Sequence, residues 1–156
     1  KISSGEKETN DAETKFYKGK AGVEKIYKDV LKAKEQRSYV DATIVGKFFP
    51  ENITKFNNTL IKNPKIKMFE IYHNTPSIHE YIKFAGRHKN YFYKFLPKST
   101  KLIGHDIFIY NNKVAIISLN KEISAVVLQN IDLYNSFKTL FDVMWKLLPE
   151  VKKEKK

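Results

Sequence analysis

The stretch LIGHDIFIYNNKVAIISLN at residues 102–120 decides the fold of this chain. Apolar residues fill positions 107–110 and 114–119, and the pair Asn111-Asn112 separates the two runs. Two runs that are rich in β-branched and aromatic residues, joined by an Asn pair, predict a β-hairpin. The apolar content of the second run is typical of a strand buried on both faces in the middle of a sheet. We therefore expect this hairpin to form the centre of the fold.

Outward from the hairpin, strands alternate with helices along the chain. The other predicted strands cover residues 15–17, 39–45, 66–72, 90–96 and 123–128. Helices are predicted where apolar residues recur every three or four positions, at residues 23–31, 53–60 and 78–85, and from Asn130 or Asp132 onward to residue 148. Strand–helix alternation followed by a meander is typical of an α/β domain with a mixed β-sheet flanked by helices.

Length and composition predict a single folded domain. The chain has 156 residues, of which 42% are hydrophobic and 13% aromatic, as in a globular protein with a core. Residues 1–14 are polar and aperiodic, so we expect a flexible linker, followed by a folded regulatory domain at 15–149 and a disordered basic tail at 150–156. The chain does not begin with Met, which indicates a fragment of a longer protein. No cysteine is present, which fits a cytoplasmic location, and no apolar run reaches the ~18 residues that span a membrane.

The charge of the chain favours contact with nucleic acids only weakly. The formal net charge is +12, and lysines that neutralise phosphates release counterions. The lysines are scattered, however, and arginine, which grips bases and phosphates through two bonds, occurs only at Arg37 and Arg87. A solvated, lysine-rich surface is the simpler interpretation. A free-standing nucleic-acid-binding domain stays open as a weaker hypothesis.

Polar residues at predicted strand ends form the candidate ligand-binding group, because ligand sites in open α/β sheets gather there. The members of this strand-end group are His73, His105, Ser118 and Asn120. No metal site is expected, because no two histidines have the i, i+4 spacing of a helical zinc site and there is no cysteine. No cofactor is expected either, since the chain has no glycine-rich phosphate loop and no nucleophile elbow.

The hairpin resembles one motif of the phospholipase D superfamily, HxKxxxxD followed by a GSxN-like segment. His105 stands at the histidine position, and Ser118 with Asn120 resembles the S-x-N, two positions early. Ile107 occupies the lysine position and Asn112 the aspartate position. In that family the histidine is the phosphoryl nucleophile and the lysine holds the phosphate charge. An apolar residue at the lysine position removes the electrostatic contribution on which such chemistry depends. The resemblance therefore implies a catalytically silent relative.

A longer pattern resembles the C-terminal effector domain of TrmB-family transcriptional regulators. It consists of FYKGKAGVEKIY at 16–27, FLP at 95–97, IYNNKVA at 109–115 and F-x-x-x-F-x-x-x-W at 137–145. The resemblance implies a phospholipase D-like fold without its catalytic residues, which dimerises or senses a small molecule such as a sugar or a phosphorylated compound. It also implies a DNA-binding winged helix upstream of Lys1.

The primary hypothesis is a non-enzymatic regulatory domain of a transcription regulator, with no catalytic residue and a homodimeric state. Any effector is expected at the strand-end group. Phe137, Phe141 and Trp145 recur at helical spacing, and we expect them to pack in the core, with a dimer contact as the alternative. The alternative function is a divergent phospholipase D-like phosphodiesterase or nuclease that uses His105.

Overall fold

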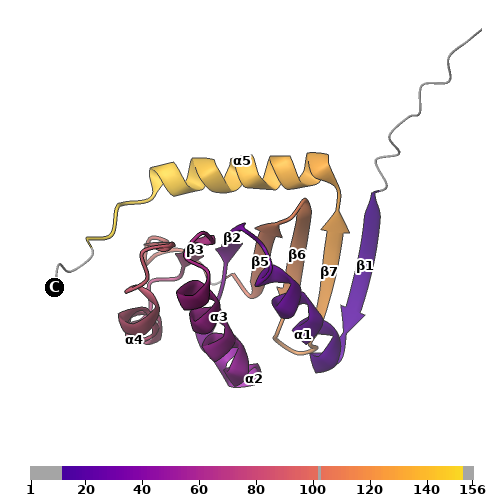
Figure 1. The fold of residues 1–156 in the computed structure, drawn as a ribbon, viewed down its shortest axis with the longest axis horizontal. Helices are drawn as coiled ribbons and strands as arrows, with labels where there is room; N and C mark the ends of the chain where they lie inside the picture. Colours follow the sequence, from indigo (N-terminus) through magenta and orange to yellow (C-terminus); the bar gives the residue numbers. More distant parts are fainter. Residues whose placement is uncertain (1–11, 102, 153–156) are drawn as a thin grey trace, which may run out of the picture.

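The computed structural model describes residues 12–101 and 103–152 and shows a seven-stranded sheet with helices on both faces (Figure 1). The strands are β1 (Glu13–Lys18), β2 (Glu35–Tyr39), β3 (Lys67–Tyr72), β4 (Tyr91–Phe95), β5 (His105–Tyr110), β6 (Lys113–Ser118) and β7 (Ser124–Gln129). The helices are α1 (Gly19–Val30), α2 (Ala42–Phe48), α3 (Pro50–Lys62), α4 (Pro76–Ala85) and α5 (Ile131–Leu147).

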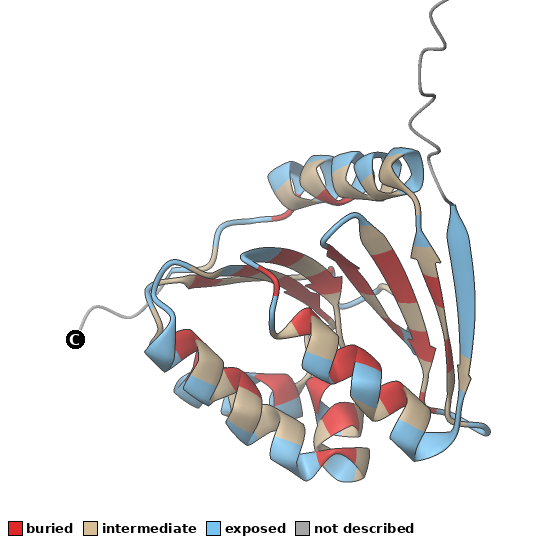
Figure 2. Ribbon diagram, turned by 45° about the vertical axis from the view of Figure 1, so that its right-hand side comes forward, coloured by how far each residue is buried: buried red, intermediate tan, exposed pale blue. Residues whose placement is uncertain are grey.

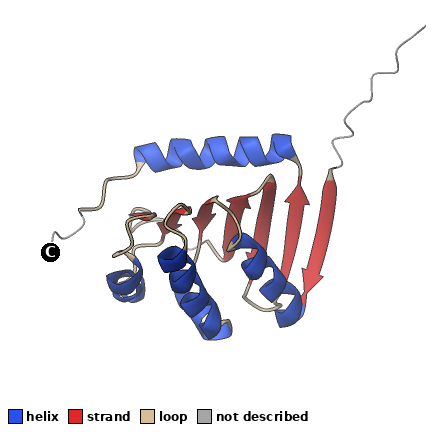
Figure 3. Cartoon of the chain, in the orientation of Figure 1, coloured by secondary structure: helices blue, strands red, loops and turns tan. Residues whose placement is uncertain are grey.

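The predicted mixed sheet is confirmed. The strand order is β1-β7-β6-β5-β2-β3-β4. Figure 3 shows the strands in one layer between the helices. Strands β2, β3 and β4 run parallel to one another, whereas the pairs that involve β1, β5, β6 and β7 are antiparallel. The parallel half is built from crossovers that contain helices, and the antiparallel half from the hairpin and its neighbours.

The predicted hairpin is also confirmed, and it lies in the middle of the sheet. Strands β5 and β6 are joined by Asn111 and Asn112, whose φ angles are 43° and 58°. A two-residue hairpin turn of type I′ needs positive φ at both positions, and asparagine tolerates this conformation better than most residues. In β6, Val114 and Ala115 point to opposite faces and both are completely buried. The strand is therefore covered on both sides.

Helices α1 to α4 pack on one face of the sheet, and α5 lies across the other (Figures 1 and 2). Strand β5 shows the division, because its side chains alternate between the faces. Phe108 packs in the same cluster as Tyr27 of α1, whereas Ile109 packs against Phe141 of α5. Each face has its own hydrophobic core, so the central strands are covered on both sides, whereas β1 at the edge of the sheet is largely exposed.

Two polar contacts hold α5 over the parallel half of the sheet. Arg37 of β2 donates from Nε to Oδ1 of Asp142 at 2.6 Å. Lys94 of β4 donates from Nζ to the carbonyl oxygens of Trp145 and Leu148, at 2.8 and 3.0 Å. The last turn of a helix has carbonyl groups without intrahelical partners, and a lysine ammonium group satisfies them.

One predicted strand is wrong. Residues 39–45 do not form a strand; β2 is instead the polar stretch Glu35–Tyr39, and helix α2 follows it. The side chain of Asp41 accepts hydrogen bonds from the backbone N–H groups of Thr43 and Ile44, and so caps α2. A good N-cap contributes about 1 kcal/mol, and the burial of Ala42 and Val45 on the inner side of α2 adds tertiary packing to it.

The ends of the chain lie largely outside the described residues. Strand β1 begins at Glu13, within the predicted linker at 1–14, of which residues 1–11 are not described. In the predicted tail, residues 150–152 belong to no helix or strand, and residues 153–156 lie outside the description. Within the described ranges, no helix combines the length and the apolar character needed to cross a membrane.

Candidate functional site

The structure brings the strand-end group to one edge of the sheet. His105 begins β5 and lies opposite Ser118 of β6 in the register. His105 shares its face with Ile107 and Ile109, two and four residues further on, which pack under α5. His73 directly follows β3, and Asn120 comes two residues after the end of β6. The four predicted residues thus come from three neighbouring parts of the sheet.

Two members of the group contact the backbone just before β5. The N–H of Ile103 donates to Nε2 of His73 at 2.8 Å. Nδ2 of Asn120 donates to the carbonyl oxygen of Gly104 at 3.0 Å. A Cβ atom on Gly104 would lie 2.7 Å from that same Nδ2, so a larger residue would displace Asn120. These contacts hold the backbone that leads into His105, whose own side chain is exposed.

The hollow beside the strand-end group is small. His73 and His105 line it together with Tyr39, Ile71 and Leu96 among others, and its volume is about 10 Å³. This space corresponds to about one water molecule. A ligand of His105 would therefore lie on the open surface of the protein and not in a closed cavity.

The positions of the phospholipase D motif do not all converge on His105. Ile107 packs against the cluster that contains Ile71 and Phe141, beneath α5. Asn112 lies in the hairpin turn, at the far end of β5 from His105. A charged lysine at position 107 would lie within an apolar cluster, which explains why isoleucine fits there.

Asp106 points to the opposite face from His105 and is 3% exposed. Its Oδ2 accepts a hydrogen bond from the hydroxyl of Tyr27 at 2.8 Å, and its Oδ1 accepts one from the backbone N–H of Asp41 at 3.0 Å. Burial raises the pKa of Asp106 to about 7, although both hydrogen bonds act in the other direction. The carboxyl group therefore titrates near neutral pH, in the core beneath α1.

A second buried carboxyl group, Glu70 of β3, lies among hydroxyl groups. Ser38 donates to its Oε1 at 3.2 Å, and Tyr91 donates to its Oε2 at 2.8 Å; the hydroxyl of Tyr72 also donates to Oε2. Burial raises the pKa of Glu70 against the effect of these bonds. The neighbouring amide of Gln36 has no hydrogen-bond partner among the described residues. Glu70 and Gln36 line a hollow of about 30 Å³, which has room for water only.

Phe137, Phe141 and Trp145 of α5 face the sheet. Phe141 is 1% exposed and stacks on Trp145, with the ring centroids 5.7 Å apart. Phe137 is partly buried in the same cluster. In the described part of the chain, no three His, Asp or Glu side chains gather closely enough to hold a metal ion.

No family model and no curated protein matches the sequence. Three solved structures resemble the fold at low sequence identity. TrmBL2, an archaeal chromatin protein with a novel mode of DNA binding, is 14% identical with a TM-score of 0.59, and the match covers 92% of this chain and 56% of TrmBL2. NucT from Helicobacter pylori is 11% identical with a TM-score of 0.65, over 90% of this chain and 100% of NucT. Nuc from Salmonella typhimurium, a phospholipase D family member, is 13% identical with a TM-score of 0.62, over 92% and 100%.

These likenesses show that the chain has the predicted phospholipase D-like fold. The chain spans 56% of the length of TrmBL2 and matches Nuc over its full length. The prediction that the chain is not an enzyme is contradicted, because a phospholipase D family member shares the whole fold. That prediction rests on Ile107 and Asn112 at two motif positions and on the resemblance to TrmB-family effector domains. The fold fits a chromatin protein and a phospholipase D family member alike.

Proposed function

We propose that this chain is a regulatory domain of a TrmB-like, DNA-associated protein, and that it acts as a homodimer paired through α5. The observation that carries the proposal is an exposed row of leucines on α5. Leu133, Leu140 and Leu147 are spaced by seven residues and are 40%, 67% and 78% exposed. The aromatic residues on the inner side of the helix hold it to the sheet, so the leucine row is directed outward.

A leucine at every seventh position lies on one stripe of a helix, which is the spacing that pairs two helices in a coiled coil. Val143 and Met144, which are 53% and 39% exposed, widen the stripe near its C-terminal end. Exposed apolar patches of this kind mark interaction surfaces. A second copy of the chain presents the same row, and two rows related by a twofold axis are complementary to each other.

We propose dimer formation through α5 as the main role of the domain, ahead of small-molecule sensing at the strand-end group, because the hollow there holds about one water molecule. A sugar or phosphorylated effector at that group would bind on the surface around His105. The proposal further includes a winged helix upstream of Lys1 as the DNA-binding part, and a cytoplasmic location. The similarity to TrmBL2, a chromatin protein that binds DNA, supports this wider assignment.

Sedimentation velocity tests the pairing. We expect the wild-type chain to sediment as a dimer at micromolar concentration and Leu140→Lys to sediment as a monomer, since a lysine in the row would be buried without a partner. Ile61→Lys is the matched control, because Ile61 on α3 is 64% exposed, close to the 67% of Leu140. A monomeric wild type, or a dimer that survives Leu140→Lys, would contradict the proposal.

A second candidate function is phosphodiester hydrolysis at His105. It is favoured by the exposure of His105 opposite Ser118 at an open strand end and by the full-length match to Nuc. Hydrolysis of bis(4-nitrophenyl) phosphate by the wild type, lost in His105→Ala and retained in His88→Ala, would support this candidate. If the wild type shows no turnover, or if His105→Ala keeps it, this candidate is excluded for this substrate.

A further inference from the structure

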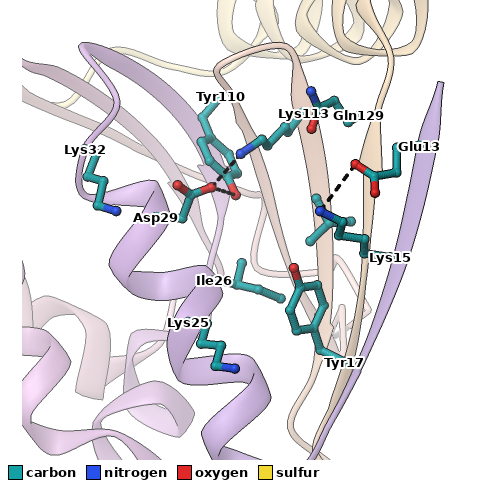
Figure 4. Close-up of a pocket in the computed structure, with 11 residues that line it drawn as sticks. Glu13, Lys15, Tyr17, Lys25, Ile26, Asp29, Lys32, Tyr110, Lys113 and Gln129 are labelled. Carbon is teal, nitrogen blue, oxygen red and sulfur yellow. Dashed lines mark hydrogen bonds and ion pairs between the residues drawn. The ribbon is translucent and has the colours of Figure 1, made fainter. Parts of the chain in front are cut away.

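A groove lies between α1 and the outer strands of the sheet, away from the strand-end group (Figure 4). Its volume is about 280 Å³. The register of the strands places it at the opposite edge of the sheet from His105. Glu13, Gln129 and Lys113 are register partners at the groove, whereas His105 is aligned with Ser118 at the other strand ends. We call this space the α1–β1 groove.

Positive charge dominates the α1–β1 groove. Four lysines line it, from α1, β1, β6 and the segment after α1, against two carboxylates. One carboxylate, Asp29, is already engaged, because it accepts hydrogen bonds from Lys113 at 2.8 Å and from the Tyr110 hydroxyl at 3.1 Å. Partial burial raises the pKa of Asp29, but these two bonds outweigh it and bring the pKa below its ordinary value. Asp29 is thus ionised; it forms an ion pair with Lys113, and the nearby charge of Lys32 also lowers its pKa.

Two lysines of the groove form no ion pair with any described residue. Lys25 is on α1 and Lys32 follows its C-terminal end. Lys25 lines the groove from the helix itself, and Lys32 lines it from the turn that follows the helix. Opposite them, Lys15 of β1 pairs with Glu13 at 3.3 Å, and both side chains are about half exposed. Such exposed pairs are weak, so a stronger anion can displace the carboxylate of Glu13.

The floor of the groove is suited to a compact organic group. Ile26 and Val127 are buried and supply an apolar surface. Tyr17 lies on the same side of the groove as Lys15, and Figure 4 shows its hydroxyl directed toward the space between β1 and α1. The volume is at the lower end of the range for small-molecule pockets, which is about 300–1,000 Å³. A duplex does not enter a groove of this size, whereas a phosphorylated compound of the size of a hexose does.

We propose that the α1–β1 groove binds a small phosphorylated molecule, whose phosphate is held by Lys25, Lys32 and Lys15 and whose remaining part lies on Ile26 and Tyr17. A phosphate dianion offers acceptor oxygens to several ammonium groups at once, which one carboxylate cannot do. The site is separate from the leucine row of α5 and from His105. It therefore stands independently of the proposed function, and a regulatory or an enzymatic domain could each carry it.

Calorimetric titration with glucose 6-phosphate and with glucose tests the proposal. We expect saturable binding of the phosphorylated sugar and none of glucose. The double variant Lys25→Gln/Lys32→Gln should weaken binding at least tenfold, whereas the matched control Lys65→Gln/Lys89→Gln should bind like the wild type. Lys65 and Lys89 are exposed and lie in loops near the β4 end of the sheet. Melting temperatures of both variants establish that they are folded.

Methyl and aromatic NMR signals locate the binding. Shifts of the Ile26 methyl and Tyr17 ring signals on addition of glucose 6-phosphate would support the proposal. An equal loss of affinity in both double variants would overturn it, since scattered charge would then explain the binding. The absence of saturable binding of glucose 6-phosphate to the wild type would also overturn the proposal. So would a short DNA duplex that binds with the same dependence on Lys25 and Lys32, because these lysines would then belong to a nucleic-acid site.

Discussion

His105 and Asp106 are neighbours in the sequence but lie in different environments. His105 is exposed on the face of the sheet that α5 packs on, whereas Asp106 is buried on the face that α1 covers and contacts Tyr27 and Asp41. The alternation of a strand predicts that the two side chains point to opposite faces. It does not predict that a carboxyl group is the buried one. The tertiary contact with Tyr27, 79 residues away, decides this.

The stability of the protein should fall as the pH rises through the titration of Asp106. The pKa of Asp106 in the folded state is about 7, above its ordinary value of 3.8, so the folded state binds this proton more tightly than the unfolded state. The stabilisation is complete below pH 3.8 and is lost as the pH rises to about 7. The full difference is on the order of 4 kcal/mol. Glu70, whose pKa is also raised by burial, acts in the same direction.

Asp106→Asn removes this titration, because an amide stays neutral at every pH. We expect the free energy of unfolding of the wild type to decrease between pH 5 and pH 8, and that of Asp106→Asn to change less, by urea denaturation at each pH. Glu70 is present in both proteins, so the difference between them reports Asp106 together with its interaction with Glu70. Equal pH dependence in the two proteins would show that Asp106 is not the titrating group.

At the scale of elements, long amphipathic or strongly apolar segments were predictable and a short polar strand was not. The sequence patterns of the hairpin and of α5 allow only one assignment of secondary structure, because each has a long run of apolar residues with the period of a strand or of a helix. Strand β2 has the sequence EQRSY and pairs on both sides in the centre of the sheet. Its buried residues are Gln36 and Ser38, so no hydrophobic alternation marks it. The position of β2 in the sheet depends on Glu70 of β3, which accepts a hydrogen bond from Ser38 of β2.

The attachment of α5 should depend on Lys94. This residue is 3% exposed and satisfies two carbonyl groups at the end of α5. Lys94→Met keeps most of the side-chain volume but leaves both carbonyl groups without a donor, so we expect a loss of about 1–3 kcal/mol in the free energy of unfolding. Fluorescence of Trp145, the only tryptophan, measures whether α5 has moved.

Lys83→Met is the control for this prediction, because it removes a lysine of an exposed ion pair on α4. Such surface changes alter stability by less than about 0.5 kcal/mol. If Lys94→Met and Lys83→Met have equal stability, the two hydrogen bonds of Lys94 do not hold the helix. The same comparison tests whether α5, which carries the leucine row, is firmly attached to the sheet.

At the scale of the whole molecule, the first and the last strand are neighbours in the sheet. Strand β1 pairs with β7, more than a hundred residues away, and together with α1 they enclose the α1–β1 groove. Local patterns predict that these strands exist but not that they are neighbours, because strand pairing over such a separation is a property of the complete fold. For this reason the sequence does not predict the groove, whereas local patterns are enough to propose the strand-end group.

The net charge of +12 predicts weak, nonspecific binding of nucleic acid. Lysines distributed along the chain attract DNA without a defined contact surface, so we expect a dissociation constant for a short duplex weaker than about 1 µM at physiological salt, with a steep dependence on salt concentration. Lys25→Gln/Lys32→Gln and Lys65→Gln/Lys89→Gln each remove two charges and should weaken DNA binding by the same small factor, measured by fluorescence anisotropy at several salt concentrations. Tighter binding of DNA, or a large loss of DNA affinity in only one of the two variants, would identify a DNA-binding face on this domain. That result would favour the nucleic-acid hypothesis over the leucine row of α5 as the basis of the function of the domain.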